Sequence, residues 1–285
     1  MKNKTILIAG AGGFLGRSAA EQFKKHRLLL AGKQDFSLDD ETFVKKYEGA
    51  EVIMNFAGVP VIRRWSKRNK KAILQSRIAT TKKLGLIISQ GKPLERHYIA
   101  VSAIGIYPDE GIHTEKSTGR SNSFLRDVVD RWEGEALDLR RSDCPVCILR
   151  TGVVLGKNGG MMKKILPVFK LGLGGKIGSG KQAFSWIHIK DLSRALEFVI
   201  GRKRSGIYNL VSPGNCTNAE FTKEFAWALH RPALFFVPGW TLRIFYGRAA
   251  EILLGGPKVI PERLISEGFE FRFKDIGSAL QDIVN

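Results

Sequence analysis

The sequence predicts an α/β fold built on a doubly wound parallel sheet, with a smaller, mostly helical lobe at its C-terminal end. In the first half, short apolar runs alternate with segments of helical spacing, which is the order of strands joined by crossover helices. After about residue 212, amphipathic helical segments prevail. The chain has 285 residues, enough to bury a core without disulfides or metal ions.

The strands of the sheet are expected in six apolar runs, and four helices in the segments between the first five. The expected strands cover residues 5–9, 28–31, 52–55, 96–102, 147–151 and 206–211. The expected helices lie near residues 17–26, 40–48, 68–90 and 123–141.

The first strand leads into a glycine turn. Residues 6–16 read ILIAGAGGFLG, and 6–9 are too few and too β-branched for a helix. The next ten residues, RSAAEQFKKH, have helical spacing. A strand, a glycine turn and a helix in this order predict a Rossmann-type dinucleotide site, rather than a tight turn that binds nothing. The predicted binding residues are Gly10, Gly12, Gly13, Phe14, Leu15 and Gly16.

The glycines of this turn have different expected roles. Gly10 permits the tight turn, and Gly12 or Gly13 lets backbone N–H groups approach a pyrophosphate. Gly16 lets the helix pack close to the strand, so that the helix N-terminus faces the anion.

The second half holds a glycine-rich segment and several helices. Residues 170–181 are expected to form a loop. In SWIHIKDL, 185–192, Trp186 is expected in the core, and His188 is interpreted as fixing loop geometry rather than as catalytic. Thr217 is a predicted N-cap because Glu220 follows three residues later. The segment 240–255 is a predicted helix whose aromatic residues indicate either a packed lobe, the favoured interpretation, or membrane contact.

These observations predict two parts. Residues 1–156 form a dinucleotide-binding domain, which residues 184–211 complete. Residues 157–183 and 212–285 form a substrate lobe over the carboxyl edge of the sheet, where open α/β sheets bind ligands.

The chain is strongly basic, with 46 Lys and Arg against 27 Asp and Glu and a formal charge of +19. The densest run is RRWSKRNKK, residues 63–71, and the other basic residues are scattered. No signature of a nucleic-acid-binding fold is present, so no specific nucleic-acid partner is expected. A basic cleft for an anionic or phosphorylated small molecule explains the excess charge at least as well as nucleic-acid binding, which only the charge supports.

Cysteine content and hydropathy favour a cytoplasmic protein. The three cysteines imply no disulfide framework. Cys144 and Cys147 form a C-x-x-C that runs into a predicted strand, so neither a redox motif nor a metal site is expected. No apolar run reaches the roughly 18 residues of a membrane span. The apolar start is interrupted by the glycine turn, which argues against a signal peptide.

Several segments together resemble one superfamily, the extended short-chain dehydrogenases/reductases that include nucleotide-sugar epimerases and dehydratases. The matching segments are GAGGFLG at 10–16, NFAG at 55–58, VSAIGIYP at 101–108, LRTGVVLG at 149–156 and SWIHIKDL at 185–192. The chain is more closely similar to the subfamily called "epimerase family protein", which ends in a small domain of unknown function. That likeness is carried by residues 63–81, 171–192 and 261–273.

The resemblance implies a nicotinamide cofactor, a substrate pocket between the lobes, and Ser, Tyr and Lys as the catalytic groups. In the superfamily Tyr is the acid/base, Lys lowers its pKa, and Ser binds the substrate oxygen. Ser102 matches the serine. The Tyr-x-x-x-Lys is missing, because Phe124 or Leu125 stands in the Tyr position and Val128 or Val129 in the Lys position.

Tyr107, five residues beyond Ser102, is the candidate replacement. It is expected on a loop at the mouth of the site, where it is either a packing or substrate-contacting aromatic, or an acid tuned by Arg126, Asp127 or Arg131.

The cofactor is expected to be NADP, with NAD possible. The second strand ends at Lys33 without an acidic residue at its tip, and Asp35 follows. A basic residue there suits a 2′-phosphate, so Lys33, with Arg17, is expected at the phosphate and Asp35 near the adenine. By the resemblance, Asn55, Ala57 and Gly58 also belong to the cofactor site, although Asn55 could instead cap the turn.

The leading hypothesis is therefore an NADP(H)-binding, oxidoreductase-like protein of the nucleotide-sugar epimerase/dehydratase type that lacks the usual proton relay. The alternative is a cofactor-sensing regulatory protein with weak or no turnover, which the missing Tyr and Lys favour.

Overall fold

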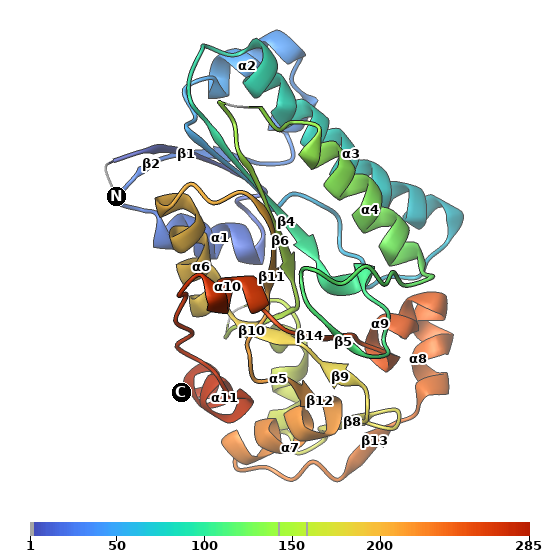
Figure 1. Cartoon of the computed structure of the whole chain (residues 1–285). Helices are drawn as coiled ribbons and strands as arrows, with labels where there is room; N and C mark the ends of the chain where they lie inside the picture. Colours follow the sequence, from blue (N-terminus) through green and yellow to red (C-terminus); the bar gives the residue numbers. More distant parts are fainter. Residues whose placement is uncertain (1–2, 142, 158) are drawn as a thin grey trace.

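A six-stranded parallel sheet forms the centre of the molecule (Figure 1). The computed structural model describes residues 3–141, 143–157 and 159–285. From edge to edge the strand order is β11-β6-β4-β3-β1-β2, and every neighbouring pair is parallel. These strands are β1 (Thr5–Ala9), β2 (Arg27–Ala31), β3 (Val52–Asn55), β4 (His97–Ala103), β6 (Val146–Thr151) and β11 (Gly206–Leu210).

The strand order reverses next to β1. The chain passes from β1 outward to β2 and then returns to β3 on the other side of β1. At the carboxyl ends, Ala9 is therefore in register with both Ala31 and Asn55. Such a reversal leaves a crevice at the carboxyl edge in which open α/β sheets bind ligands.

Helices cover both faces of the sheet (Figure 1). Helix α1 packs against α6 on one face, while α3 packs against α2 and α4 on the other. Side chains of β1 alternate between the two cores: Ile6 and Ile8 face the first, and Leu7 and Ala9 the second. These helices are α1 (Phe14–Gln22), α2 (Asp40–Tyr47), α3 (Lys67–Gln90), α4 (Phe124–Leu137) and α6 (Ile189–Gly201).

A third core lies in the part of the molecule that holds α5, α7 and α11, drawn below the sheet in Figure 1. It includes Leu155, Trp186, Phe225 and Leu280, which confirms Trp186 as a core residue. The elements around this core and the sheet edge are β5 (Ile112–His113), β7 (Val153–Leu155), α5 (Met162–Lys170), β8 (Gly175–Ile177), β9 (Ala183–Phe184), β10 (Trp186–His188), β12 (Cys216–Thr217), α7 (Asn218–Ala228), β13 (Phe235–Val237), β14 (Lys258–Val259), α10 (Glu262–Ser266) and α11 (Ile276–Val284).

Local signals in the second half are partly confirmed. Thr217 and Glu220 form the predicted capping box of α7. The expected loop 170–181 contains strand β8, which pairs in parallel with β13. The partner strand is some 60 residues away, and no local pattern reveals such a pairing.

The expected single helix over 240–255 is wrong. It is divided into α8 (Gly239–Tyr246), a 3-10 turn (Gly247–Ala250) and α9 (Glu251–Leu254), because Gly247 adopts a φ of 58° and ends α8. Packing of its aromatic face is also contradicted for α8, which has no buried residue. Trp240 and Phe245 are 63% and 74% exposed.

No helix in the described ranges is both long and apolar enough to cross a membrane.

Candidate functional site

The glycine turn lies at the carboxyl end of β1, beside the start of the loop after β3. Gly10 has a φ of 81°, and a Cβ there would lie 3.0 Å from the Ala57 nitrogen. A Cβ on Gly16 would overlap the carbonyl oxygen of Gly10. Both glycines are therefore required for the turn to pack against its neighbours.

The space above the middle of the turn is open. A Cβ on Gly12 would meet no atom within 4 Å. Gly13 is the N-cap of α1, and it offers no side chain to the first N–H groups of the helix. Those N–H groups have no partner within the helix, and together with the helix dipole they favour an anion. The Arg17 guanidinium donates to the carbonyl of Gly12, so a cation stands beside this space.

Phe14, the first residue of α1, does not extend into open space. Its ring packs against a second glycine run, and a Cβ on Gly159 would overlap the ring. Gly156 and Gly160 also border the ring, at 2.8 and 3.4 Å from their Cβ positions. The glycine turn thus packs against a loop that lies more than 140 residues later in the chain. This contact was not predicted from the sequence.

Beyond β2, Lys33 and Asp35 are in different situations. Lys33 is exposed and forms no ion pair with any described residue. Asp35 accepts from the backbone N–H of Gly32 at 2.7 Å and from Lys46 Nζ at 2.6 Å. Partial burial opposes ionisation of Asp35, but these hydrogen bonds prevail and lower its pKa. Both carboxylate oxygens are engaged within the protein, which leaves Lys33 as the free charge at the strand tip.

Asn55 is buried and makes all its hydrogen bonds within the protein. Its amide nitrogen donates to Thr81 Oγ1 at 3.2 Å and to the Tyr98 hydroxyl at 3.0 Å. Its amide oxygen accepts from the Ala57 N–H at 3.0 Å. Asn55 thus caps the turn that presents Ala57 and Gly58, and its contact with a cofactor stays a prediction.

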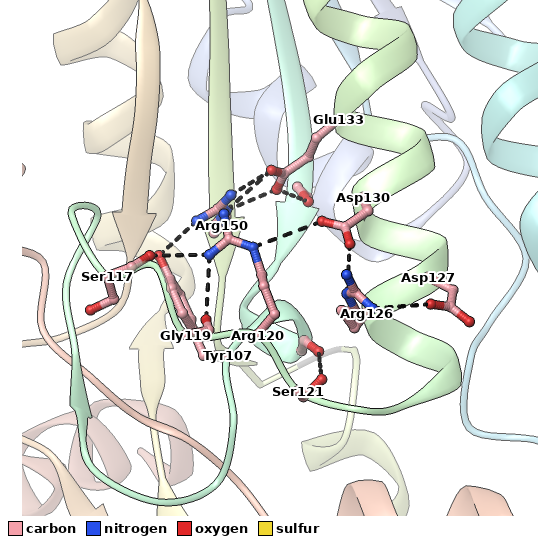
Figure 2. Close-up of polar contacts among 12 residues, drawn as sticks. Tyr107, Ser117, Gly119, Arg120, Ser121, Arg126, Asp127, Asp130, Glu133 and Arg150 are labelled. Carbon is pink, nitrogen blue, oxygen red and sulfur yellow. Dashed lines mark hydrogen bonds and ion pairs between the residues drawn. The ribbon is translucent and has the colours of Figure 1, made fainter.

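Ser102, near the end of β4, belongs to a buried ionic network with Glu133 and Arg150. Figure 2 shows Glu133 facing Arg150. The Ser102 hydroxyl donates to Glu133 Oε1 at 2.8 Å. Arg150 on β6 binds both oxygens of the same carboxylate, with Nε–Oε1 at 2.9 Å and Nη2–Oε2 at 2.6 Å. Only 3% of Ser102 is exposed. Since its proton is held by Glu133, Ser102 can offer a ligand only lone pairs.

Tyr107 is the other end of this network, and it is not at the mouth of a cleft as expected. It is 1% exposed and stacks on His113 with ring centroids 5.2 Å apart. Its hydroxyl donates to Asn209 at 2.9 Å and accepts from Arg150 Nη1 at 2.8 Å. Burial raises the pKa of Tyr107, although Arg150 opposes the shift.

The expected tuning of Tyr107 by Arg126, Asp127 or Arg131 is not observed. Arg126 instead pairs with Asp130 at 2.7 Å on the same helix. Glu133, Arg150 and Asn209 were not predicted from the sequence. The signal for Arg150 is its place inside an apolar strand, because a charge there needs a partner.

The α4 positions that the resemblance assigns to Tyr and Lys are apolar. The Phe124 ring packs edge-on against Trp65, with centroids 5.1 Å apart. Leu125 packs against Gly105, just after β4. Val128 and Val129 are buried. This face offers neither a phenol nor an ammonium group.

Arg77 of α3 places a guanidinium group beside α4. Arg77 Nη1 donates to the carbonyls of Val59, at 3.2 Å, and Ile73, at 3.0 Å. The guanidinium carbon lies 5.2 Å from the Trp132 ring of α4. No ion pair of Arg77 occurs among the described residues. Burial lowers its pKa to about 10, so it remains charged at neutral pH.

Three further residues with titratable side chains, His188, Asp191 and Cys144, are buried or hydrogen-bonded within the fold. His188 caps α6 by accepting from the Lys190 N–H at 3.1 Å. This contact agrees with the expectation that His188 fixes the local backbone. Asp191 accepts from the N–H groups of Arg272 and Phe273, at 2.9 and 2.8 Å. Cys144 is a buried free thiol whose pKa burial raises to about 11. Nothing in these surroundings activates a thiolate.

Comparison with known proteins assigns the family. Residues 6–210 match the NAD dependent epimerase/dehydratase family, and residues 237–283 match a domain of unknown function, DUF1731. The chain belongs to the NAD-dependent epimerase/dehydratase family. This confirms the resemblance to extended short-chain dehydrogenases/reductases with a small C-terminal domain.

Relatives match the chain over nearly its whole length. It is 34% identical to the mouse "Epimerase family protein SDR39U1", covering 98% of this chain and 99% of that protein. It is also 34% identical to "Epimerase family protein Mb2239" of Mycobacterium bovis, covering 98% and 97% of the two chains.

The fold also matches solved structures over nearly its whole length. The human epimerase family protein SDR39U1, crystallised with NADPH, superposes with a TM-score of 0.88, at 31% identity and 98% coverage of both chains. A Bacillus cereus UDP-glucuronic acid 4-epimerase superposes with a TM-score of 0.78, covering 98% of both chains, but at 15% identity that likeness concerns the fold alone.

Proposed function

We propose that this protein binds NADP(H) across the carboxyl edge of its sheet and is an oxidoreductase-like protein of the nucleotide-sugar epimerase/dehydratase type. The observation that carries the proposal is the glycine turn. It combines open space above Gly12 with an α1 N-terminus that has no side-chain cap. This is an arrangement suited to a pyrophosphate.

The neighbouring residues fit the rest of such a cofactor. The N–H groups of Gly12, Phe14 and Leu15 would hold the pyrophosphate. Gly13 would permit its close approach, because the Gly13 N–H already donates to the Gly10 carbonyl at 2.9 Å. Lys33, with Arg17 nearby, would hold a 2′-phosphate, and the engagement of Asp35 by Gly32 and Lys46 favours NADP over NAD. Ala57 and Gly58 would border the second half of the cofactor. When bound, the nicotinamide would supply or accept a hydride.

The NADPH in the human relative supports this choice of cofactor, since that protein matches the present chain from end to end. The substrate class is proposed from the family and from the excess of basic residues, which favours an anionic or phosphorylated small molecule.

We assign Ser102 and Tyr107 to the chemistry of the site, with Ser102 accepting a hydrogen bond from a substrate hydroxyl. Glu133 and Arg150 would hold Ser102 in that orientation. Because α4 supplies no Tyr or Lys, turnover on ordinary nucleotide sugars should be slower by about 10²–10⁴-fold than with an intact acid/base relay.

The second candidate function is cofactor sensing without turnover. It is favoured by the apolar relay positions on α4 and by the burial of both candidate hydroxyl groups.

Calorimetric titration of the purified protein with NADPH and NADH, followed by assays on a panel of nucleotide sugars, tests both candidates. We expect NADPH to bind more tightly than NADH. Slow turnover that Ser102→Ala abolishes supports the enzyme, whereas tight NADPH binding with no turnover on any sugar nucleotide supports the sensor. Failure of either cofactor to bind contradicts both.

A further inference from the structure

Arg77 places a positive charge at the part of the sheet edge where helix α4 lacks one. Its Nη1 is held by two backbone carbonyls, those of Val59 and Ile73. A Cβ on Gly58 would lie 3.2 Å from the guanidinium carbon. The charge is therefore fixed beside the loop that follows β3.

This charge has no counter-ion in the described part of the chain. No carboxylate of the described residues lies within 4.0 Å of Arg77, and Glu133, which follows Trp132 in the chain, is paired with Arg150 at 2.6 Å. Next to Arg77 stands the ring of Trp132, whose buried indole N–H also lacks a partner. Arg77 is partly buried and lacks a counter-ion, and the buried Trp132 N–H beside it lacks an acceptor. Such a pair is unusual unless a ligand completes it.

The strand order indicates which end of the cofactor would lie here. Lys33, proposed for the 2′-phosphate, follows β2 at the sheet edge, and the glycine turn for the pyrophosphate follows β1. A dinucleotide laid across the reversal point continues over β3 and β4. The loop beside Arg77 follows β3, so it would border the nicotinamide end.

We propose that Arg77 makes the site selective for the reduced cofactor. The oxidised nicotinamide ring carries a positive charge and the reduced ring carries none. A fixed, partly buried guanidinium without a counter-ion beside the ring therefore repels NADP⁺ but not NADPH. This inference rests on the proposed NADP(H) site and adds a preference for one redox state.

The test compares the dissociation constants of three ligands: NADPH, NADP⁺ and 2′-phospho-ADP-ribose, which lacks the nicotinamide. In the unmodified protein NADP⁺ should bind more weakly than NADPH, by on the order of tenfold, which corresponds to about 1.4 kcal/mol. In Arg77→Gln and Arg77→Met this ratio should fall toward one, while the affinity for 2′-phospho-ADP-ribose stays unchanged. Arg77→Lys should keep the preference because it keeps the charge.

Lys82→Gln is the matched control, since it removes a cation of the same helix that is exposed and paired with Glu135 at 3.3 Å. It should leave the ratio unchanged. NADP⁺ that binds the unmodified protein as tightly as NADPH overturns the inference without any variant. So does an unchanged ratio in Arg77→Gln, or an equal loss of all three ligands, which would show a merely structural role. If the unmodified protein binds none of the three ligands, the proposed function itself fails.

Discussion

The hydroxyl of Ser102 donates to the carboxylate of Glu133 across 2.8 Å, in the interior between β4 and α4. The same carboxylate neutralises Arg150, which in turn donates to Tyr107. Ser102, which we propose to bind substrate, is thus tied to an ion pair, and Arg150 connects that pair with Tyr107.

Gly12→Val should abolish NADPH binding while leaving the fold intact. The new side chain would occupy space that is open in the protein but would be filled by the pyrophosphate. Calorimetry measures the affinity and thermal unfolding the fold. Gly49→Val is the matched control, because its Cβ also meets nothing within 4 Å but lies after α2. Undiminished affinity in folded Gly12→Val would contradict the pyrophosphate site.

Lys33→Glu should weaken NADPH binding more than NADH binding. It replaces attraction to the 2′-phosphate by repulsion, and a charge-assisted phosphate contact contributes roughly 1.5–3 kcal/mol, so the preference should change by about tenfold or more. Both dissociation constants are measured by fluorescence titration. Lys25→Glu, an equal change of charge on another exposed lysine, should leave the preference as it is. If Lys33→Glu weakens both cofactors equally, Lys33 does not discriminate between them.

Glu133→Gln should destabilise the fold by about 3–5 kcal/mol, because it leaves the buried guanidinium of Arg150 without its counter-ion. Urea unfolding measures the change. Adding Arg150→Met should recover part of the loss, since the unpaired charge is then removed as well. Glu135→Gln on the same helix breaks only the partly exposed pair with Lys82 and should cost less than about 1 kcal/mol. Equal effects of the two glutamate variants would contradict the role given to the buried pair.

Acid should weaken the fold between about pH 6.5 and pH 4 through His97. Burial lowers the pKa of His97 to about 4. Its buried Nδ1 has no hydrogen-bond acceptor beside it, so a proton added there would stay without a partner. In this window the unfolded chain binds a proton that the folded chain does not. The free energy of unfolding therefore falls as the pH falls, by at most about 1.4 kcal/mol per unit for this group.

His97→Gln should reduce that slope in urea unfolding measured at several pH values. The exposed His230→Gln should not change it. A slope that is identical in the unmodified protein and His97→Gln would assign the acid sensitivity to other groups.

The sheet could be predicted from sequence because its strands are continuous apolar runs that end at turn residues. β1 and β3 begin and end at the predicted residues. Helix α1 begins three residues earlier than predicted, because Gly13 has an extended backbone and acts as the N-cap, although it has no capping side chain. The glycine turn could be predicted from the spacing of its glycines, because Gly10 and Gly16 are needed for the backbone to pack closely there.

The polar network could not be predicted, because tertiary pairing creates it. Ser102 and Arg150 face each other only through the register of β4 with β6, and Glu133 reaches them from α4. The exposure of Tyr107 was mispredicted for the same reason, since His113 and Asn209 come from distant segments to enclose it. Likewise no local pattern distinguishes Arg77 from the surface cations around it.

The contact of Phe14 with Gly156, Gly159 and Gly160 has a consequence for sequence variation. Any side chain at 159 would collide with the ring, so this position and position 14 cannot vary independently. An alanine at 159 requires a smaller residue at 14, and a leucine or alanine at 14 relaxes the demand for glycine at 159. The two positions, distant in the chain, should therefore covary as a single unit in any set of functional variants selected from a library randomised at both positions.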